Sequence, residues 1–183
     1  CPRKSRRSEV GMKQQQKPKL PAHPWELVET EFKPQDYNLN ATLFSLGNGF
    51  IGLRGTFEEG FDPEPFAEGC YLNGVYASEP ITYGESAYGY ARNNQRMLTV
   101  PNGKSILLWV DGERFSLAEG ELLSYERRLD MAAGLLHRKL VWRSPQGKTI
   151  ELHSRRLVSL SKQHLYVLDY RLTPLDFDGE VRL

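Results

Sequence analysis

Polar and apolar residues alternate along much of the chain after residue 24. In 165–172, one side of an extended chain carries Tyr166, Leu168, Tyr170 and Leu172, and the other carries Val167, Asp169 and Arg171. A period of two is typical of an antiparallel strand with one buried face.

Two further stretches predict β-hairpins. SILLWVDGERFSL, residues 105–117, reads as two strands joined by Asp111-Gly112, a pair that favours a tight turn. LHRKLVWRSPQGKTIEL, residues 136–152, reads as a hairpin that turns at 144–147. The nearest approach to an amphipathic helix, 116–134, is interrupted by Gly120, and its central residues also fit a strand. We therefore predict an all-β fold, a large antiparallel β-sandwich that spans residues 25–183.

The stretch GNGFIG, residues 47–52, has the G-x-G-x-x-G spacing of a dinucleotide-binding loop. That loop requires a helix that opens at its last glycine, but the next residues include Gly55, Gly60 and Pro63, which break helices. The alternative is a hairpin in which Asn48-Gly49 forms a type I′ turn, with both residues at positive φ. We favour the hairpin.

Residues 56–96 do not follow the strand pattern and predict a long loop. The loop contains five tyrosines: Tyr71, Tyr76, Tyr83, Tyr88 and Tyr90. A tyrosine ring combines a flat apolar face with a hydroxyl group, which is the combination that a sugar ring needs. Tyr83, Tyr88 and Tyr90 are the candidate substrate-binding residues. The structural alternative is that the tyrosines cover the end of the sandwich and bond to the backbone.

The same region carries five carboxylates: Glu58, Glu59, Asp62, Glu64 and Glu68. A carboxylate pair can perform acid–base catalysis, but nothing nearby in the sequence predicts burial or a shifted pKa. We expect a solvated acidic loop. For Arg54, we favour a structural pairing with a carboxylate across the end of the sandwich over a contact with a sugar.

Composition narrows the possible partners. The 183 residues carry a net charge of +1, so no strong field attracts nucleic acid or an anionic membrane, and the apolar runs are too short to span a bilayer. The only cysteines are Cys1 and Cys70, which is compatible with a reducing, cytoplasmic location and no disulfide. The four histidines lack zinc-ligand spacing, so we expect no metal site.

Residues 1–24 are basic and rich in proline and glutamine, and we interpret them as a disordered tail that contains no secretory signal. Met12 is a candidate native start.

Four stretches occur in order along the rest of the chain: LFSLGNGFIGLRGTFEEG, YLNGVY, VPNGKSILLWVDGERF and RRLDMAAGLLHRKLVWRSPQGKTIELHSRRLVSL. Together they resemble the amino-terminal domain of glycoside hydrolase family 65, which contains maltose, trehalose and kojibiose phosphorylases and some trehalases. The resemblance covers about residues 25–183.

The resemblance implies a β-sandwich of the galactose-mutarotase type, followed in the whole enzyme by a separate (α/α)6 barrel. In the phosphorylases, a glutamic acid of the barrel protonates the glycosidic oxygen while inorganic phosphate attacks the anomeric carbon from the opposite face. A disaccharide substrate, phosphate as co-substrate, no other cofactor and a homodimer are implied in the same way. The barrel has no counterpart in this sequence, so no catalytic residue is assigned. The chain stops inside an apparent strand after Asp178-Gly179, so we expect a truncated sandwich with an unpaired edge.

We therefore expect the non-catalytic amino-terminal domain of an inverting α-glucoside phosphorylase, which shapes the substrate entrance or the dimer interface. Three alternatives stay open: the same domain of a trehalose hydrolase, a stand-alone carbohydrate-binding or interaction module, and an aldose epimerase. The epimerase would use His137 and His153, on neighbouring strands, as acid and base.

Overall fold

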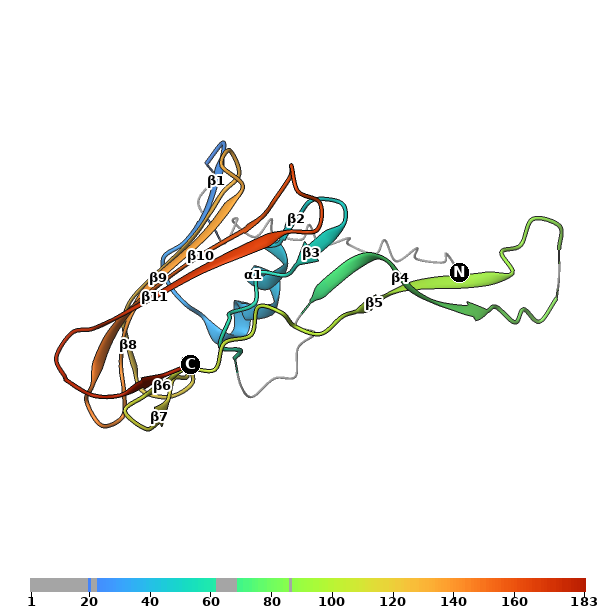
Figure 1. Cartoon of the computed structure of the whole chain (residues 1–183). Coiled ribbons are helices and arrows are strands. Elements are labelled where there is room, and N and C mark those ends of the chain that lie inside the picture. The colour runs from blue at the N-terminus through green and yellow to red at the C-terminus, as the bar shows by residue number, and fades with distance from the viewer. Residues whose placement is uncertain (1–19, 21–22, 62–68, 86) are drawn as a thin grey trace, which may run out of the picture.

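The computed structural model describes residues 20, 23–61, 69–85 and 87–183 (Figure 1). These residues form three antiparallel sheets with little helix, so the prediction of an all-β antiparallel sandwich is confirmed. The predicted tail lies outside the described residues except for positions 20, 23 and 24.

The main sheet has five strands in the order β1-β8-β9-β10-β11. Their bounds are β1 Glu26–Glu29, β8 Glu121–Asp130, β9 Leu135–Arg143, β10 Thr149–Val158 and β11 Tyr166–Pro174. The predicted hairpin with its turn at 144–147 is the β9–β10 pair, with Thr149 opposite Arg143. The ambiguous stretch after Gly120 is strand β8, because its alternate side chains are buried against the core.

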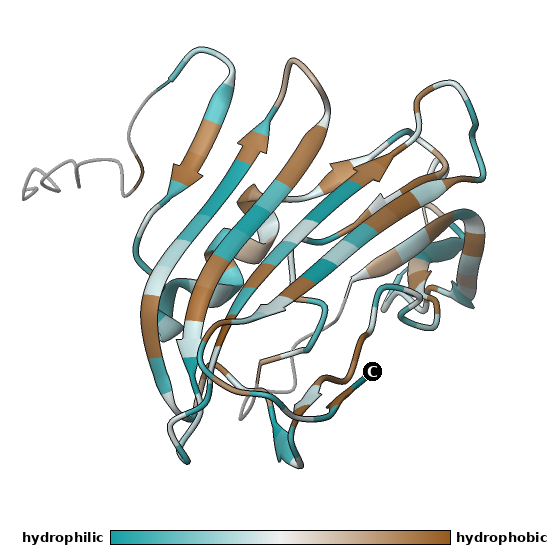
Figure 2. Ribbon diagram, turned by 60° about the vertical axis from the view of Figure 1, so that its left-hand side comes forward, coloured by the Kyte–Doolittle hydropathy of each residue, from teal (hydrophilic) through white to brown (hydrophobic). Residues whose placement is uncertain are grey.

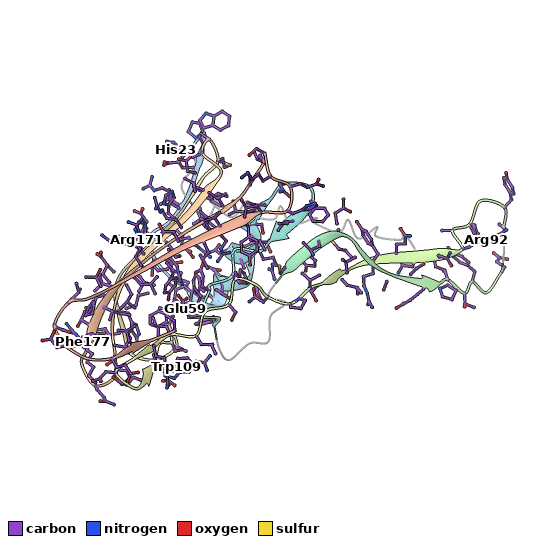
Figure 3. The ribbon with its side chains drawn as sticks, in the orientation of Figure 1. His23, Glu59, Arg92, Trp109, Arg171 and Phe177 are labelled. Carbon is purple, nitrogen blue, oxygen red and sulfur yellow. The ribbon has the colours of Figure 1, made fainter. Side chains whose placement is uncertain are left out.

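One face of this sheet is buried and the other is open. On β9, Leu136, Leu140 and Trp142 are buried, whereas Lys139 and Arg143 are exposed. Figure 2 shows the resulting bands of apolar and polar residues along the strands. The alternation predicted for β11 follows the same rule, since Tyr170 packs against the core and Arg171 lies on the outer side (Figure 3).

The second layer contains a small sheet in the order β12-β6-β7, with β6 Trp109–Val110, β7 Glu113–Arg114 and β12 Val181–Arg182. Asp111 and Gly112 both have positive φ, which confirms the predicted tight turn between β6 and β7. The strand that follows Asp178-Gly179 pairs with β6, with Val181 opposite Val110, but β12 stands at the edge of this sheet among the described strands, so one of its sides has the unpaired edge that we expected.

The remaining sheet has the order β2-β3-β4-β5, with β2 Leu46–Gly47, β3 Ile51–Leu53, β4 Cys70–Pro80 and β5 Asn93–Thr99. Strands β4 and β5 form a long hairpin that extends away from the main sheet (Figure 1). The prediction of one long loop over 56–96 is therefore wrong. The hairpin projects from the core, so neither of its faces is uniformly buried and no clean alternation marks it.

A short helix, α1 (Tyr37–Leu43), follows a 3-10 turn at Pro34–Asp36 and was not predicted. Its two turns bury Tyr37, Asn40 and Ala41, a helical spacing too short to stand out in the sequence. Arg54 donates hydrogen bonds to the Asn38 carbonyl at 3.0 Å and to Thr42 Oγ1 at 2.8 Å, so these contacts are structural, but they are made to α1 and not to the expected carboxylate.

Candidate functional site

Six charged side chains are buried between the main sheet and the layer that contains α1. They are Glu29, Glu58, Glu59, Arg127, Arg138 and Arg156. Each arginine projects from the inner face of a different strand, β8, β9 or β10. The two glutamates at 58 and 59 come from the segment that leaves β3. The cluster thus joins the two layers with equal numbers of positive and negative groups.

Arg138 is the centre of one half of this cluster. Its Nη2 donates to Glu58 at 2.9 Å and to both carboxylate oxygens of Glu59 at 2.7 Å. Arg156 bonds to Glu58 and donates to the Thr56 carbonyl at 2.9 Å. Figure 3 shows Glu59 on the inner side of the main sheet.

The other half of the cluster is built on Glu29. One of its carboxylate oxygens accepts from Arg127 Nε at 2.9 Å and from the Tyr125 hydroxyl at 2.8 Å, while Asn40 Nδ2 donates to the other oxygen. The Arg127 guanidinium also lies over the Phe44 ring, 4.2 Å from its centroid. Burial together with aromatic and carboxylate contacts fixes this guanidinium in place.

The charge state of the cluster follows from its geometry. Burial opposes ionisation of Glu58, but the charges of Arg156 and Arg138 outweigh it and lower the pKa of Glu58 to about 2. Burial and the neighbouring Glu59 carboxylate raise the pKa of the Tyr170 hydroxyl, which donates to Glu59. These groups therefore hold one protonation state across the physiological range.

The expectation of a solvated acidic loop is wrong for Glu58 and Glu59, while Asp62, Glu64 and Glu68 lie outside the described residues. A general acid needs a raised pKa and access to substrate, and the ionised Glu58, buried under two arginines, has neither. The cluster therefore has a structural role, because its buried ion pairs hold the two layers together. The sequence signal for it is an arginine at an inward position of β9, between Leu136 and Leu140.

The GNGFIG stretch is a hairpin turn, as we favoured, but its central residues are not those expected. The Asn48 backbone N–H donates to the Ile51 carbonyl at 3.1 Å, so the two central residues are Gly49 and Phe50. Of the residues in this turn, only Gly49 has a positive φ, of 87°. Glycine at the first central position is the arrangement of a type II′ turn, not type I′.

The Asn48 side chain uses its full hydrogen-bonding capacity in this turn. Its Oδ1 accepts from the backbone N–H groups of Phe50 at 2.9 Å and Ile51 at 2.8 Å. Its Nδ2 donates to the carbonyls of Ser159 at 2.7 Å and Gln163 at 3.0 Å, in the loop between β10 and β11. Asn48 therefore ties the turn between β2 and β3 to the loop between β10 and β11 of the main sheet.

Replacing Asn48 by alanine is expected to lower the free energy of unfolding by about 1–3 kcal/mol, because four hydrogen-bonding groups lose their partner. Urea unfolding followed by tryptophan fluorescence measures the change. Asn94→Ala, at an exposed position of β5, is the matched control and should have little effect. Equal effects of the two substitutions would show that the Asn48 contacts contribute nothing.

A groove with a volume of about 450 Å³ lies beside this turn. Its lining residues include Phe50, Tyr71, Asn73, Tyr76 and Met97. The Tyr76 hydroxyl donates to Asn73 Oδ1 at 2.8 Å, so both polar groups are oriented at the mouth of a mostly apolar surface. The groove is therefore an exposed aromatic surface at the base of the β4–β5 hairpin.

The predicted sugar-contacting tyrosines lie at the other end of that hairpin, in the loop between β4 and β5. The Tyr83 and Tyr90 rings pack together with their centroids 4.9 Å apart. The Tyr88 side chain is fully exposed to solvent, with a relative exposure of 108%. Figure 3 shows this end of the hairpin, marked by Arg92, far from the main sheet. The alternative in which these three tyrosines cover the end of the sandwich does not fit this position.

His137 and His153 lie on β9 and β10, on the outer face of the main sheet, with ring centroids 6.4 Å apart. Burial, His137 and nearby cations such as Arg155 lower the pKa of His153. An epimerase needs its acid and base on either side of a bound sugar, whereas these two rings lie stacked on the same face of one sheet.

Over the described part of the chain, no group of three or more metal-ligating side chains is close enough to hold an ion. No described helix is both long and apolar enough to cross a membrane.

The described residues form an antiparallel β-sandwich whose layers are joined by buried ion pairs and from which a tyrosine-rich hairpin projects. Residues 27–183 match the profile of the glycosyl hydrolase family 65 N-terminal domain, and the chain belongs to this family.

Its relatives include phosphorylases of several disaccharides. The chain is 44% identical to an α,α-trehalose phosphorylase of Thermoanaerobacter brockii over 91% of its own length and 22% of that protein. It is 34% identical to a kojibiose phosphorylase of Halothermothrix orenii, over 87% of this chain and 19% of that one. The solved structure of a putative kojibiose phosphorylase from the human microbiome superposes with a TM-score of 0.77 at 26% identity, over 88% of this chain and 21% of that one. The chain thus spans about a fifth of the length of these relatives.

Proposed function

We propose that this chain is the non-catalytic amino-terminal domain of an inverting phosphorylase that cleaves an α-linked glucose disaccharide with inorganic phosphate. The observation that carries the proposal is its similarity to phosphorylases of trehalose, kojibiose and maltose, at 31–44% identity. The buried, ion-paired state of Glu58 and Glu59 supports a scaffolding role, because neither carboxylate can reach a substrate.

The role that we propose for the hairpin is to shape the substrate entrance. Tyr83, Tyr88 and Tyr90 stand at the end of an arm that reaches away from the sandwich, and all three are exposed to a passing sugar, although the Tyr83 and Tyr90 rings also pack against each other. The acid and the phosphate site belong to the rest of the enzyme. A homodimer is part of the same proposal.

Hydrolysis is the second candidate, because mycobacterial relatives that are 42–43% identical carry the name glycosyl hydrolase. The two reactions differ in their nucleophile. Phosphorolysis consumes one phosphate for each bond cleaved, whereas hydrolysis releases two glucose molecules and leaves phosphate unchanged.

The test is a fusion in which residues 27–183 replace the matching fifth of the T. brockii enzyme. We expect the fusion to release glucose 1-phosphate from trehalose and phosphate, while the 183-residue chain alone releases none. Because the acid and the phosphate site of the fusion come from the T. brockii enzyme, its turnover tests only the domain role of this chain. Phosphate uptake measured beside glucose release by the longer polypeptide to which this chain belongs decides between the two reactions. Turnover by the purified chain alone would show that the catalytic residues lie within it.

Tyr83, Tyr88 and Tyr90, which we call the tip tyrosines, give a second expected result in the same fusion. Tyr83→Ala should raise KM up to about tenfold with little change in kcat, because a stacking contact that holds substrate and transition state equally would be lost. Tyr83→Phe keeps the ring and should retain most of the binding. An unchanged KM in the alanine variant would exclude Tyr83 from the substrate entrance.

A further inference from the structure

The β4–β5 hairpin is poorly supported by the rest of the described structure. Strand β3 pairs with β4 only over Cys70–Leu72, so from Tyr76 to Pro80 β4 pairs with β5 alone among the described strands. All seven residues of β5 are exposed, and β5 forms the edge of the sheet among the described strands. A two-stranded hairpin is marginally stable in water without a further layer against it. Edges and faces of this kind are normally covered.

The composition of the hairpin is that of a protein interface. Residues 70–99 contain five of the nine tyrosines of the chain and only four charged residues: Glu79, Glu85, Arg92 and Arg96. No lysine or aspartate occurs in this stretch. The centres of protein interfaces are enriched in tyrosine and methionine and depleted in lysine, glutamate and aspartate.

Apolar side chains form one surface at the hairpin base. Tyr76 and Met97 face each other across the two strands, and both are exposed. They continue into the groove lined by Phe50 and Tyr71, on the other side of the bulge in β4. We call the surface formed by Phe50, Tyr71, Tyr76 and Met97 the hairpin-base surface.

The greater length of the relatives indicates a partner for this surface. In the solved relative, the part that matches this chain accounts for 21% of the polypeptide, and in the T. brockii relative it accounts for 22%. A domain that forms a fifth of a longer enzyme needs a surface against which the rest of the polypeptide packs. The hairpin-base surface is apolar and nearly uncharged, so it fits a partner with an apolar face better than it fits solvent.

We propose that the hairpin-base surface is the docking surface for the catalytic part of the longer family 65 polypeptide, and that the hairpin is the arm that joins the two domains. This inference rests on the proposed function. It also explains the position of the tip tyrosines, because an arm fixed at its base can carry them to the substrate entrance.

Hydrogen–deuterium exchange of the chain alone and of the T. brockii fusion tests the proposal. Docking should slow exchange of the backbone amides in 73–80 and 93–99 at least ~tenfold in the fusion. The double variant Tyr76→Ser with Met97→Ser should remove that protection while leaving the unfolding midpoint of the chain alone unchanged. Leu160→Ser is the matched control, because Leu160 is 84% exposed in the loop between β10 and β11, outside the hairpin.

Equal exchange in both proteins would overturn the proposal. So would protection that appears in the chain alone as its concentration rises, because a second copy would then be the partner.

If the fusion does not fold, the chain and the rest of the T. brockii enzyme are expressed as two polypeptides. The wild-type chain should co-elute with that part and the double variant should not, and failure of the wild-type chain to associate also overturns the proposal. Exchange does not depend on turnover, so an inactive fusion with a protected hairpin would contradict the proposed function and leave the docking surface intact.

Discussion

Replacing Arg138 by leucine is expected to lower the free energy of unfolding by about 3–5 kcal/mol. The substitution removes the guanidinium that bonds to both Glu58 and Glu59, at 2.9 Å and 2.7 Å. Among the described residues, Glu59 would keep only the Tyr170 hydroxyl as a hydrogen-bond partner, and its charge would lie buried without a cation. Burying an uncompensated carboxylate costs far more than the leucine side chain recovers by apolar contact with Phe57, over which Arg138 now lies.

The matched control lies on the same strand. Arg143→Leu removes a cation whose bond to Glu121, at 3.0 Å, is solvent-exposed, so the expected change is below about 1 kcal/mol. Urea unfolding of both variants at neutral pH gives the comparison, with the buried Trp142 as the fluorescence probe. A similar, small loss for both variants would show that the buried cluster does not lock the layers together.

The strands of the main sheet could be predicted from the sequence because one of their faces is buried. The period of two is visible in the sequence of β11, where residues of the outer face alternate with Tyr166, Leu168, Tyr170 and Leu172. The β4–β5 hairpin could not be found in this way. Its strands are set by pairing between Tyr76–Pro80 and Asn93–Met97, without a core to impose an alternation.

The buried cluster was missed for a different reason. Glu58 and Glu59 look like part of an acidic surface run, and their partners Arg138 and Arg156 are about 80 and 98 residues away in the sequence. Only the register of β9 and β10 brings these arginines to the same inner face. A charged residue at an inward position such as Arg138 nevertheless indicates a buried counter-charge, and this signal was available in the alternation itself.

The GNGFIG turn shows the limit of reading a turn type from a residue pair. Asn-Gly was expected to supply two central residues at positive φ, but Asn48 lies before the turn. Its side chain is committed to Ser159 and Gln163, more than 100 residues further along the chain. This long-range contact selects the register of the turn. The turn propensities of the neighbouring residues alone could not predict the contact.

Acid is expected to destabilise the chain through the same cluster. The pKa of Glu58 is about 2 in the folded chain, against an ordinary value of 4.5. Because the folded value is the lower one, the stabilisation from this carboxylate is fully present above pH 4.5 and is lost as the pH falls towards 2. The difference corresponds to about 3 kcal/mol of unfolding free energy.

Urea unfolding of the wild type and of Glu58→Gln between pH 6 and pH 2.5 isolates this contribution. Glutamine keeps the shape of the side chain but carries no charge, so the variant should be less stable at pH 6 because the buried Arg156 guanidinium loses the carboxylate with which it forms an ion pair. As the pH falls below 4.5, the wild-type glutamate itself becomes protonated on unfolding, and the gap between the two proteins should close. Glu121→Gln, at an exposed ion pair on β8, should show almost no gap at any pH. A gap for Glu58→Gln that stays constant down to pH 2.5 would mean that Glu58 is not held ionised by Arg138 and Arg156, and that the loss at pH 6 comes from altered packing instead.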